Sequence, residues 1–525
     1  MRRILSLLMV VCMLLGTLLL VGCPSPDDGG TTTTTKPGGG GEQPSEWADS
    51  LDTNAVIKDL GANPTLTISY FDQYEYEIYA EEDDKDSVAQ MIYKRNKKLE
   101  ERFGATIIPD VTKGVGEVDL TSHLEYARNE LRSMQPSFDL LAMRAARSGM
   151  LVADGYYRDW RASVPYARES IAAGDAWWPA DMNKSITICG RQFVAVSDIS
   201  LSMINDAFVI LFNESLVDTN NIVTDYAATQ QAEWETMYDI VHAGAWTLDA
   251  LISMTKDFWI DNENAGTKEM VDVEDTIGFY NSGGSEIDNF PFGLGFQLIE
   301  NDGVSEPQIW TLPATFDTIV NTLRSYFDDN NGAEKSTFGS YEDRSTAFAN
   351  GRIAFMTGWM HDLQRQQIRG MEHNRSVLPY PKLNQDQTKY YTTSSDGLTM
   401  ISVPRFTTGK RLKTAGAMVV ALSAETHRSI VEPYYEMIVK HDNGFVNKAA
   451  IEMIDLIMEG RVYDLSLVHA YDFQYGQDSL EKLNSFLRYL LNSNTSSTAS
   501  GIWFSAGPIL QNKMRTLINV YKNLP

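Results

Sequence analysis

Strand-like and helix-like segments alternate at the start of the folded part of this chain. The apolar runs 65–71, 105–109 and 138–143 have the length and residue types of buried strands. Segments with apolar residues close to helical spacing, 86–103 and 120–134, separate these runs. Strands connected by helices in this way form βαβ units, in which a mainly parallel sheet is covered by helices on both faces. The alternation therefore predicts an α/β fold.

The length of the chain requires more than one such unit. A single hydrophobic core stops growing near roughly 250–300 residues, and this chain has 525. At least two domains are therefore expected. The chain carries 44 Lys and Arg against 70 Asp and Glu, a formal net charge of −26. This acidic excess argues against a nucleic-acid-binding protein, which needs a clustered basic face, and against adhesion to anionic lipid headgroups.

The first 23 residues have the pattern of an export signal. Arg2 and Arg3 precede the apolar run Ile4–Leu20, and Val21-Gly22-Cys23 follows. A charged start, a short apolar run and small residues before a cut site are typical of a secretory signal peptide, here 1–22. A membrane-spanning helix is the alternative, but the run is at the lower limit of the length that a span needs. The Leu-x-Gly-Cys tetrapeptide resembles the lipobox of bacterial lipoproteins, in which the Cys is acylated.

The lipobox implies that Cys23 carries acyl chains, which would hold the mature protein on the extracellular face of the cell membrane. The following residues, 23–62, are rich in Gly, Thr, Pro and Ser and predict a flexible tether. Cys12 leaves with the signal peptide, so Cys189 is the remaining free thiol. It ends the apolar segment Ile186–Cys189, which predicts a strand and a buried structural Cys.

A motif near residue 350 predicts where a ligand binds. A helix-like segment ends at Gly351, a strand-like run covers Ile353–Met356, and Gly358 and Trp359 follow. Ligands of open α/β sheets bind beyond the carboxyl ends of the strands. We therefore expect Trp359 to present its ring at such an end.

Four groups of motifs, taken in order, resemble those of a known family. They are Phe348-x-x-Gly351-Arg352-x-Ala354-Phe355-x-x-Gly358-Trp359 with Leu378-Pro379-x-Pro381, Gly190–Val196 with Val209–Leu216, Trp246–Leu251, and Asp139-Leu140 with Tyr157–Trp160. The family is that of the extracellular solute-binding lipoproteins of bacterial ABC importers, specifically the carbohydrate-binding family 1 that includes maltodextrin-binding proteins. The likeness covers nearly the whole mature chain.

The resemblance implies a two-lobed, type II periplasmic-binding-protein-like fold. Each α/β lobe would be a mainly parallel sheet flanked by helices, and a multi-segment hinge would join the lobes. Lobe 1 would comprise 63–203 and 394–440, and lobe 2 would comprise 204–393 and 441–525. The implied function is capture of an oligosaccharide or another small molecule in the inter-lobe cleft and its delivery to ABC transporter permease subunits. We expect a monomer, anchored to the membrane through lipid, with no catalytic residues, no cofactor and no nucleic-acid partner.

Candidate ligand-binding residues follow from the chemistry of sugars, which offer flat C–H patches and hydroxyl edges. Such sites combine aromatic faces with charged groups that bond hydroxyls. The candidates lie at expected strand ends, at expected crossings between lobes or where relatives place stacking rings: Trp359, Trp503, Tyr280, Trp178, Asp72, Arg144, Asp198 and Asp396. The alternative for each ring is packing in a core, and for each charge an exposed loop or a cap at the hinge.

An acidic turn, 261–266, lies where relatives often have a calcium-loop-like turn. Ala265 has no side-chain oxygen, and Asp272 stands where that pattern has a bidentate Glu. We therefore predict no metal site.

Two other functions remain open. An exported glycan-active enzyme would use two carboxylates, which a chain with 70 acidic residues always supplies. The sequence has no Gly-x-Ser-x-Gly motif, no His-Glu-x-x-His motif and no phosphate-binding Gly-rich loop, and its seven His are scattered. An oligopeptide-binding or sensor lipoprotein would keep the two-lobed architecture, and the sequence does not separate it from a sugar-binding protein.

Overall fold

The computed structural model describes residues 47–72, 77–113, 117–264, 266–268, 270, 275–328, 330, 332–439, 448–492 and 497–525. Trp47–Pro525 forms one compact unit. The predicted signal peptide 1–22, the lipidation site Cys23 and most of the predicted tether lie outside the described residues, as does Asp272. Within the described ranges, no helix has the length and apolar character needed to cross a membrane.

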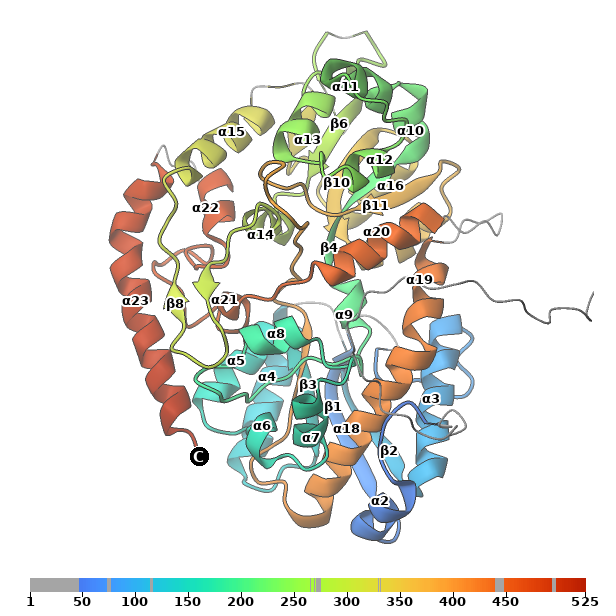
Figure 1. Ribbon diagram of the computed structural model, residues 1–525, viewed down its shortest axis with the longest axis vertical. Helices are drawn as coiled ribbons and strands as arrows, with labels where there is room; N and C mark the ends of the chain where they lie inside the picture. The colour runs from blue at the N-terminus through green and yellow to red at the C-terminus, as the bar shows by residue number, and fades with distance from the viewer. Residues whose placement is uncertain are drawn as a thin grey trace, which may run out of the picture. The chain divides into compact units, whose positions relative to one another are not determined.

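The first sheet has the strand order β12-β3-β1-β2, of which β3, β1 and β2 are labelled in Figure 1. Its strands are β1 (Thr65–Asp72), β2 (Thr106–Lys113), β3 (Leu140–Arg144) and β12 (Thr399–Ser402). β1 pairs in parallel with both β2 and β3, and β12 runs antiparallel to β3. The prediction of a mainly parallel sheet is therefore confirmed for this half of the protein.

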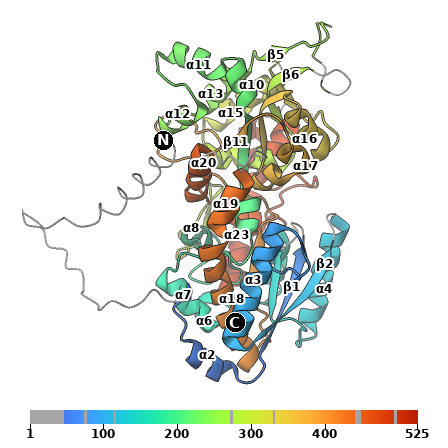
Figure 2. The same cartoon turned by 90° about the vertical axis from the view of Figure 1, so that its right-hand side faces the viewer.

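Helices cover both faces of the first sheet. α3 (Ser87–Phe103) and α18 (Gly409–Ser429) lie on one side of β1, and α4 (Glu117–Arg132) lies on the other (Figure 2). Alternate residues of β3 supply the two cores, since Leu140 and Ala142 pack in the core of α18, whereas Leu141 and Met143 pack in the opposite core. The smaller helices of this half are α5 (Ala145–Ala153), α6 (Trp160–Ser163), α7 (Ala167–Ala173), α8 (Ala180–Ser185) and α9 (Ser202–Asn205).

The second sheet has the order β11-β4-β10-β6-β5, and β9 also pairs with β6. Its strands are β4 (Phe208–Asn213), β5 (Trp259–Ile260), β6 (Thr276–Asn281), β9 (Ala333–Lys335), β10 (Ile353–Trp359) and β11 (Arg375–Leu378). β10 and β9 are parallel to β6, but β4, β5 and β11 form antiparallel pairs. The prediction of a mainly parallel sheet is wrong here, because β4 enters from the crossing segment and places Phe208 opposite Trp359, the last residue of β10.

Short helices surround the second sheet. They are α10 (Glu214–Thr219), α11 (Ile222–Gln230), α12 (Met237–His242), α13 (Leu248–Thr255), η1 (Ser285–Asn289), α14 (Phe290–Gly293), α15 (Phe316–Asp328), α16 (Tyr341–Ala349), η2 (Met360–Gln364) and α17 (Gln366–Arg369), with the hairpin β7 (Ile299–Glu300) and β8 (Gln308–Ile309). Two sequence motifs meet here. Thr247 caps α13 by accepting a bond from the Ala250 amide at 3.2 Å, and Trp246 Nε1 donates to the carbonyl of Pro379 at 2.8 Å.

Segments that cross between the halves containing the two sheets pair with one another in the described part of the chain. Ala207 forms an antiparallel bridge with Ser394, and Thr392 forms a parallel bridge with Arg461. The Phe208 amide donates to the carbonyl of Thr393 at 3.0 Å. The crossing segments therefore lie side by side, as the resemblance predicts for a hinge; the lobe boundaries given above stay a prediction.

The C-terminal part of the chain contacts both halves. Its helices are α19 (Val431–Val439), α20 (Lys448–Glu459), α21 (Leu465–Val468), α22 (Phe486–Asn492) and α23 (Ala499–Asn523). α21 packs on α5, and α22 packs on η1. The contact with α5 requires a glycine, because a Cβ on Gly149 would lie 2.1 Å from the carbonyl oxygen of Val468.

Two sequence expectations need correction. The predicted tether, 23–62, overlaps the folded unit, because Val56 and Leu60 of α2 (Thr53–Leu60) are each 1% exposed. Any flexible tether is thereby limited to residues before 47. Cys189 does not lie in a strand: it has a positive φ of 51° in the turn that joins Ile188 to Arg191, and its side chain is half-buried.

Candidate functional site

The parallel strands of both sheets end with residues that can bind a ligand. β1 and β3 end at Asp72 and Arg144, and β6 and β10 end at Asn281 and Trp359. The amide of Ala146, just beyond Arg144, donates to the carbonyl of Asp396 in a crossing segment at 3.3 Å. The strand ends of the first sheet therefore lie beside the hinge, which is the expected place for a ligand in a fold of this kind.

Trp359 is held at the end of β10 by a network of rings. Its ring lies 5.8 Å from Phe208 and 5.5 Å from His361, both stacked, and 5.3 Å from Tyr341, edge-on. The residue is 7% exposed, and its Nε1 is shielded from solvent without a hydrogen-bond partner in the described part of the chain. The structure thus places Trp359 at the predicted strand end, packed more deeply than a freely presented ring.

Gly358 is required by the packing under Trp359. A Cβ at this position would lie 2.4 Å from Leu211 Cδ1 and 2.7 Å from Asp362 Oδ2. The carboxylate cannot move away, because it accepts a bond from the Trp359 amide at 3.1 Å and pairs with Arg344 at 2.8 Å.

Replacing Gly358 by Ala is therefore expected to lower the free energy of unfolding by about 1–3 kcal/mol, since overpacking forces its neighbours to shift. Urea denaturation measures the loss. Gly339→Ala is the matched control, because its Cβ would meet only Asp343 Oδ2, at 3.9 Å. Equal stability of the two variants would show that the space around Gly358 is not restrictive.

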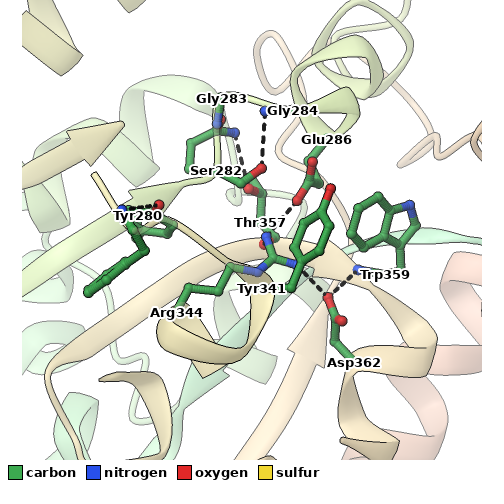
Figure 3. Close-up of polar contacts among 12 residues, drawn as sticks. Tyr280, Ser282, Gly283, Gly284, Glu286, Tyr341, Arg344, Thr357, Trp359 and Asp362 are labelled. Carbon is green, nitrogen blue, oxygen red and sulfur yellow. Dashed lines mark hydrogen bonds and ion pairs between the residues drawn. The ribbon is translucent and has the colours of Figure 1, made fainter. Parts of the chain in front are cut away.

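A buried ion cluster lies beside Trp359 (Figure 3). Arg344 of α16 pairs with Glu286 at 2.5 Å and with Asp362 at 2.8 Å, and all three side chains are at most 1% exposed. Burial raises the pKa of Asp362, but the charges of Arg344, His361 and Arg365 outweigh it and hold this pKa at about 2. Asp362 therefore stays ionised at neutral pH, and the contacts of Arg344 with Glu286 and Asp362 connect α16, η1 and η2.

A cavity of about 450 Å³ borders this cluster, because Arg344 is one of its lining residues. Its lining includes Tyr280, Ser282, Gly284, Phe338, Ser340, Tyr341 and Arg344. Tyr280 forms a wall, since it is 1% exposed and its hydroxyl accepts a bond from the Phe338 amide at 3.3 Å. Tyr341 is 43% exposed and packs edge-on against Trp359, so it can stack on a ligand. Sequence reasoning missed Tyr341, which stands at the start of a helix and follows the capping residue Ser340.

On the first sheet, Arg144 lies near Phe71, with its Cζ 5.9 Å from the ring centroid. Phe71 in turn stacks on His123 at 6.1 Å. The side chain of Asp72, the predicted partner at the end of β1, lies outside the described residues. Asp396 is half-buried and belongs to the same neighbourhood, because a Cβ on the adjacent Gly397 would lie 3.5 Å from Arg144 Cζ.

The structure adds residues that no sequence motif marked. Tyr471 contacts two cations, with Arg147 Cζ 4.7 Å and Lys482 Nζ 4.4 Å from its ring centroid. Burial raises the pKa of Tyr471, and the charges of Arg147, Asp396 and Arg144 also act on it. The side chains of Arg144, Arg147, Asp396, Tyr471 and Lys482 therefore lie in one region of the folded chain.

Three predicted ligand residues lie in other surroundings. Trp178 is 4% exposed, and its Nε1 donates to Ser170 Oγ at 2.9 Å. Trp503 of α23 packs against Trp310 and Phe486, at ring distances of 5.8 and 5.5 Å. Asp198 pairs with His427 Nδ1 at 2.6 Å, and this bond raises the pKa of His427. Packing against other aromatic or polar side chains occupies Trp178 and Trp503, and an ion pair occupies Asp198.

Another cavity, of about 820 Å³, is lined by Lys184, Phe296, Glu300, Trp310 and Tyr391, among others. None of the predicted ligand residues lines it. In the described ranges, no group of three or more His, Cys, Asp or Glu side chains could hold a metal ion. In the acidic turn, Asp261 Oδ2 accepts a bond from the Gly266 amide at 2.7 Å.

The two sheets, with their strand ends beside paired crossing segments, define the fold of type II periplasmic binding proteins. A cyclo/maltodextrin-binding protein complexed with maltotetraose is similar over 87% of this chain and 99% of its own, with a TM-score of 0.52 and 11% identity. A family 1 extracellular solute-binding protein from Bifidobacterium longum subsp. infantis is similar over 87% and 100%, with a TM-score of 0.50 and 11% identity. A sugar transporter from Rhizobium etli in an open conformation is similar over 88% and 100%, again with a TM-score of 0.50 and 11% identity. No protein-family model and no characterised protein matches the chain by sequence.

Proposed function

We propose that this protein is an extracellular solute-binding protein that captures a carbohydrate, an oligosaccharide in particular, and delivers it to the permease of an ABC importer. The observation that carries the proposal is the presence of aromatic side chains at the strand ends of both sheets, joined at the first sheet by the charged group of Arg144. Arg144 lies beside Phe71 at the first sheet, and Tyr341 lies beside Trp359 at the second. Sugars need this combination of flat apolar faces and hydrogen-bonding charges.

The fold supports the same proposal. Crossing segments that lie side by side restrict the movement of the two halves to hinge closure. A ligand that contacts both halves stabilises the closed form through its higher affinity for that form. The structural neighbours include a protein complexed with maltotetraose, a fact that supports a sugar without identifying it.

The proposal includes the place of the protein in the cell. Residues 1–22 would direct export, and Cys23 would be acylated and anchor the chain on the extracellular face of the membrane. The Leu-x-Gly-Cys motif supports this part of the proposal. The residues between Cys23 and the folded unit, which begins at Trp47, would connect the anchor to the binding protein. The ligand would be released unchanged, without a chemical step.

A thermal-shift screen tests the proposed function. The protein from Ser25 onward, which retains the folded unit, is heated with neutral oligosaccharides, acidic oligosaccharides and peptides. A ligand present at about 100 times its Kd adds about 2.7 kcal/mol to the free energy of unfolding, so a true ligand raises the midpoint clearly. Stabilisation by peptides alone, or turnover of a glycan, would contradict the proposal.

Replacing Tyr341 by Ala is expected to raise the Kd of the stabilising sugar about three- to tenfold, because one stacking surface is lost. Titration calorimetry measures the Kd, and the unfolding midpoint without sugar shows that the variant is folded. Phe504→Ala is the control, since Phe504 is an aromatic residue of α23 that is 87% exposed. A Kd unchanged by Tyr341→Ala would remove Tyr341 from the site.

A further inference from the structure

Cations gather in the candidate site although the chain as a whole carries a net charge of −26. Arg144 ends β3, Arg147 lies in the first turn of α5, and Lys482 and Arg488 come from the C-terminal part of the chain. The charges of Asp396, Arg488 and Arg147 all act on the pKa of Lys482, which burial lowers. Arg144 acts with Arg147 on the pKa of Tyr471, so these four residues, here called the basic cluster, lie in the same region.

The contacts of Tyr471 show how closely two of these charges approach each other. Arg147 Cζ lies 4.7 Å and Lys482 Nζ lies 4.4 Å from the centroid of its ring. The two charges are therefore no further apart than the sum of these distances, and they repel each other. A ring that contacts two cations stabilises each of them only modestly. Proteins rarely leave partly buried cations together without a counter-charge.

The acidic neighbours do not fully neutralise the basic cluster. Asp288 pairs with Arg488 at 2.9 Å. Burial raises the pKa of Asp288 to about 7, so its charge is incomplete at neutral pH. The hinge residue Asp206 accepts a bond from Ser395 Oγ at 2.7 Å. Asp396 is half-buried, and its charge raises the pKa of Lys482.

Two members of the basic cluster have no carboxylate partner. Among the described residues, no acidic side chain lies within ion-pair distance of Arg144 or of Lys482, and Arg144 Nε is shielded from solvent without a hydrogen-bond partner. The planar guanidinium group of an Arg binds a carboxylate with two parallel hydrogen bonds, and the Lys ammonium group adds a mobile point charge. A carboxylate group of a bound ligand would supply the partner that both residues lack.

We infer that the captured carbohydrate is acidic, a uronate-bearing oligosaccharide whose carboxylates are bound by Arg144 and Lys482. This inference rests on the proposed function and specifies its ligand. The rings of Phe71 and Tyr471, each in contact with a cation of the cluster, provide apolar faces for the sugar beside the charges. A neutral oligosaccharide would leave both cations unpaired when the halves close and exclude water.

Matched ligands test the inference by calorimetry. Trigalacturonate and trimannuronate are each compared with their methyl esters, which keep the sugar and remove the charge. At least one acid is expected to bind about tenfold or more tightly than its ester, and to bind more weakly as NaCl is raised. Triglutamate carries carboxylates on a peptide and distinguishes a uronate from an acidic peptide.

Lys482→Gln is expected to raise the Kd of the acid about tenfold and to leave the Kd of the ester unchanged. Arg144→Gln is the second variant, and the unfolding midpoint of each variant reports its folding. Lys184→Gln is the control, because Lys184 lines the separate cavity of about 820 Å³.

Each outcome separates the inference from the proposed function. If neutral sugars bind and neither acid binds more tightly than its ester, the inference is wrong and the proposed function stands. If Lys482→Gln raises the Kd of the uronate and the Kd of its methyl ester equally, the ammonium group does not bind the carboxylate and the inference is wrong. If triglutamate binds and no glycan binds, both are wrong.

Discussion

Replacing Arg344 by Met is expected to lower the free energy of unfolding by about 3–5 kcal/mol, the usual penalty for breaking a buried ion pair by removing one partner. The Arg344 side chain is 1% exposed, and the carboxylates of Glu286 and Asp362 are 0% exposed. Met fills a similar volume but carries no charge. Glu286 then loses its ion pair, and Asp362 keeps its pair with Arg365. Urea denaturation at neutral pH measures the loss.

The pH dependence of this effect has a definite sign. The pKa of Asp362 is held at about 2, below its ordinary value of 3.8. A carboxyl group with a lowered pKa in the folded state adds stability above its ordinary pKa and loses this contribution as the pH falls towards the lowered value. Without Arg344 the contribution is smaller. The difference between wild type and Arg344→Met is therefore largest at neutral pH and narrows as the pH falls from 3.8 towards 2.

Arg168→Met is the control for both measurements. Arg168 and its partner Glu169 are 49% and 56% exposed, so the replacement is expected to change the free energy of unfolding by less than about 1 kcal/mol. Equal losses for the two variants, or a loss for Arg344→Met that does not depend on pH, would contradict the role assigned to the buried ion cluster.

Local patterns predicted the first three strands of the first sheet and the two helices between them, because each of these elements carries its own signals. The expected helix 86–103 is α3, which begins after Asp86, whose side chain accepts bonds from the amides of Val88 and Ala89 at 2.7 and 3.2 Å. It ends at Gly104, which takes the left-handed conformation with φ 60°. No local sequence signal of this kind indicated the strand directions of the second sheet. β4 runs antiparallel to β10 because of where the crossing segment enters the second half, and this depends on the whole chain.

A residue of the candidate site could be predicted only where the sequence motif that contains it also contains the residues that position it. Trp359 was found because Gly358 and the preceding strand lie beside it in the sequence, and its packing was not visible there. The neighbours of Arg144 come from distant segments: Phe71 precedes it in β1, while Tyr471 and Lys482 lie near the C-terminus. No periodicity or spacing connects these segments, since only the folded chain brings them together. Tyr341 was missed for a similar reason, because an exposed helix start gives no sign of a ligand surface.

The end of the predicted tether shows how composition can hide folded structure. Gly, Thr and Pro dominate the segment before residue 47, and the average over 23–62 therefore indicated a coil. Trp47 contacts the guanidinium of Arg102, whose Cζ lies 4.2 Å from the ring centroid. A few specific contacts outweigh an unfavourable average composition when they are buried.

Replacing Arg102 by Met is accordingly expected to release the N-terminal segment of the folded unit. Arg102 Nη1 and Nη2 bind the two oxygens of Asp49 at 2.6 and 2.9 Å, Nη2 also donates to the carbonyl of Leu51 at 2.9 Å, and Nε donates to Thr53 Oγ1 at 2.9 Å. The side chains of Arg102 and Asp49 are 0% and 2% exposed. Removing Arg102 while Asp49 stays buried costs about 3–5 kcal/mol, so detachment of residues 47–62 becomes the favourable response.

Limited proteolysis followed by mass spectrometry detects this detachment. Wild-type protein should resist cleavage after Trp47, whereas Arg102→Met should be cut within 47–62 while the rest of the folded unit survives, with a lower unfolding midpoint. Lys97→Met is the control on the same helix, because Lys97 is 50% exposed in its pair with Glu100. Protection equal to wild type in Arg102→Met would show that α2 and its core residues Val56 and Leu60 hold the segment without the ion pair. Cleavage in Arg102→Met would instead identify the Arg102–Asp49 contact as the one that holds residues 47–62 on the folded unit.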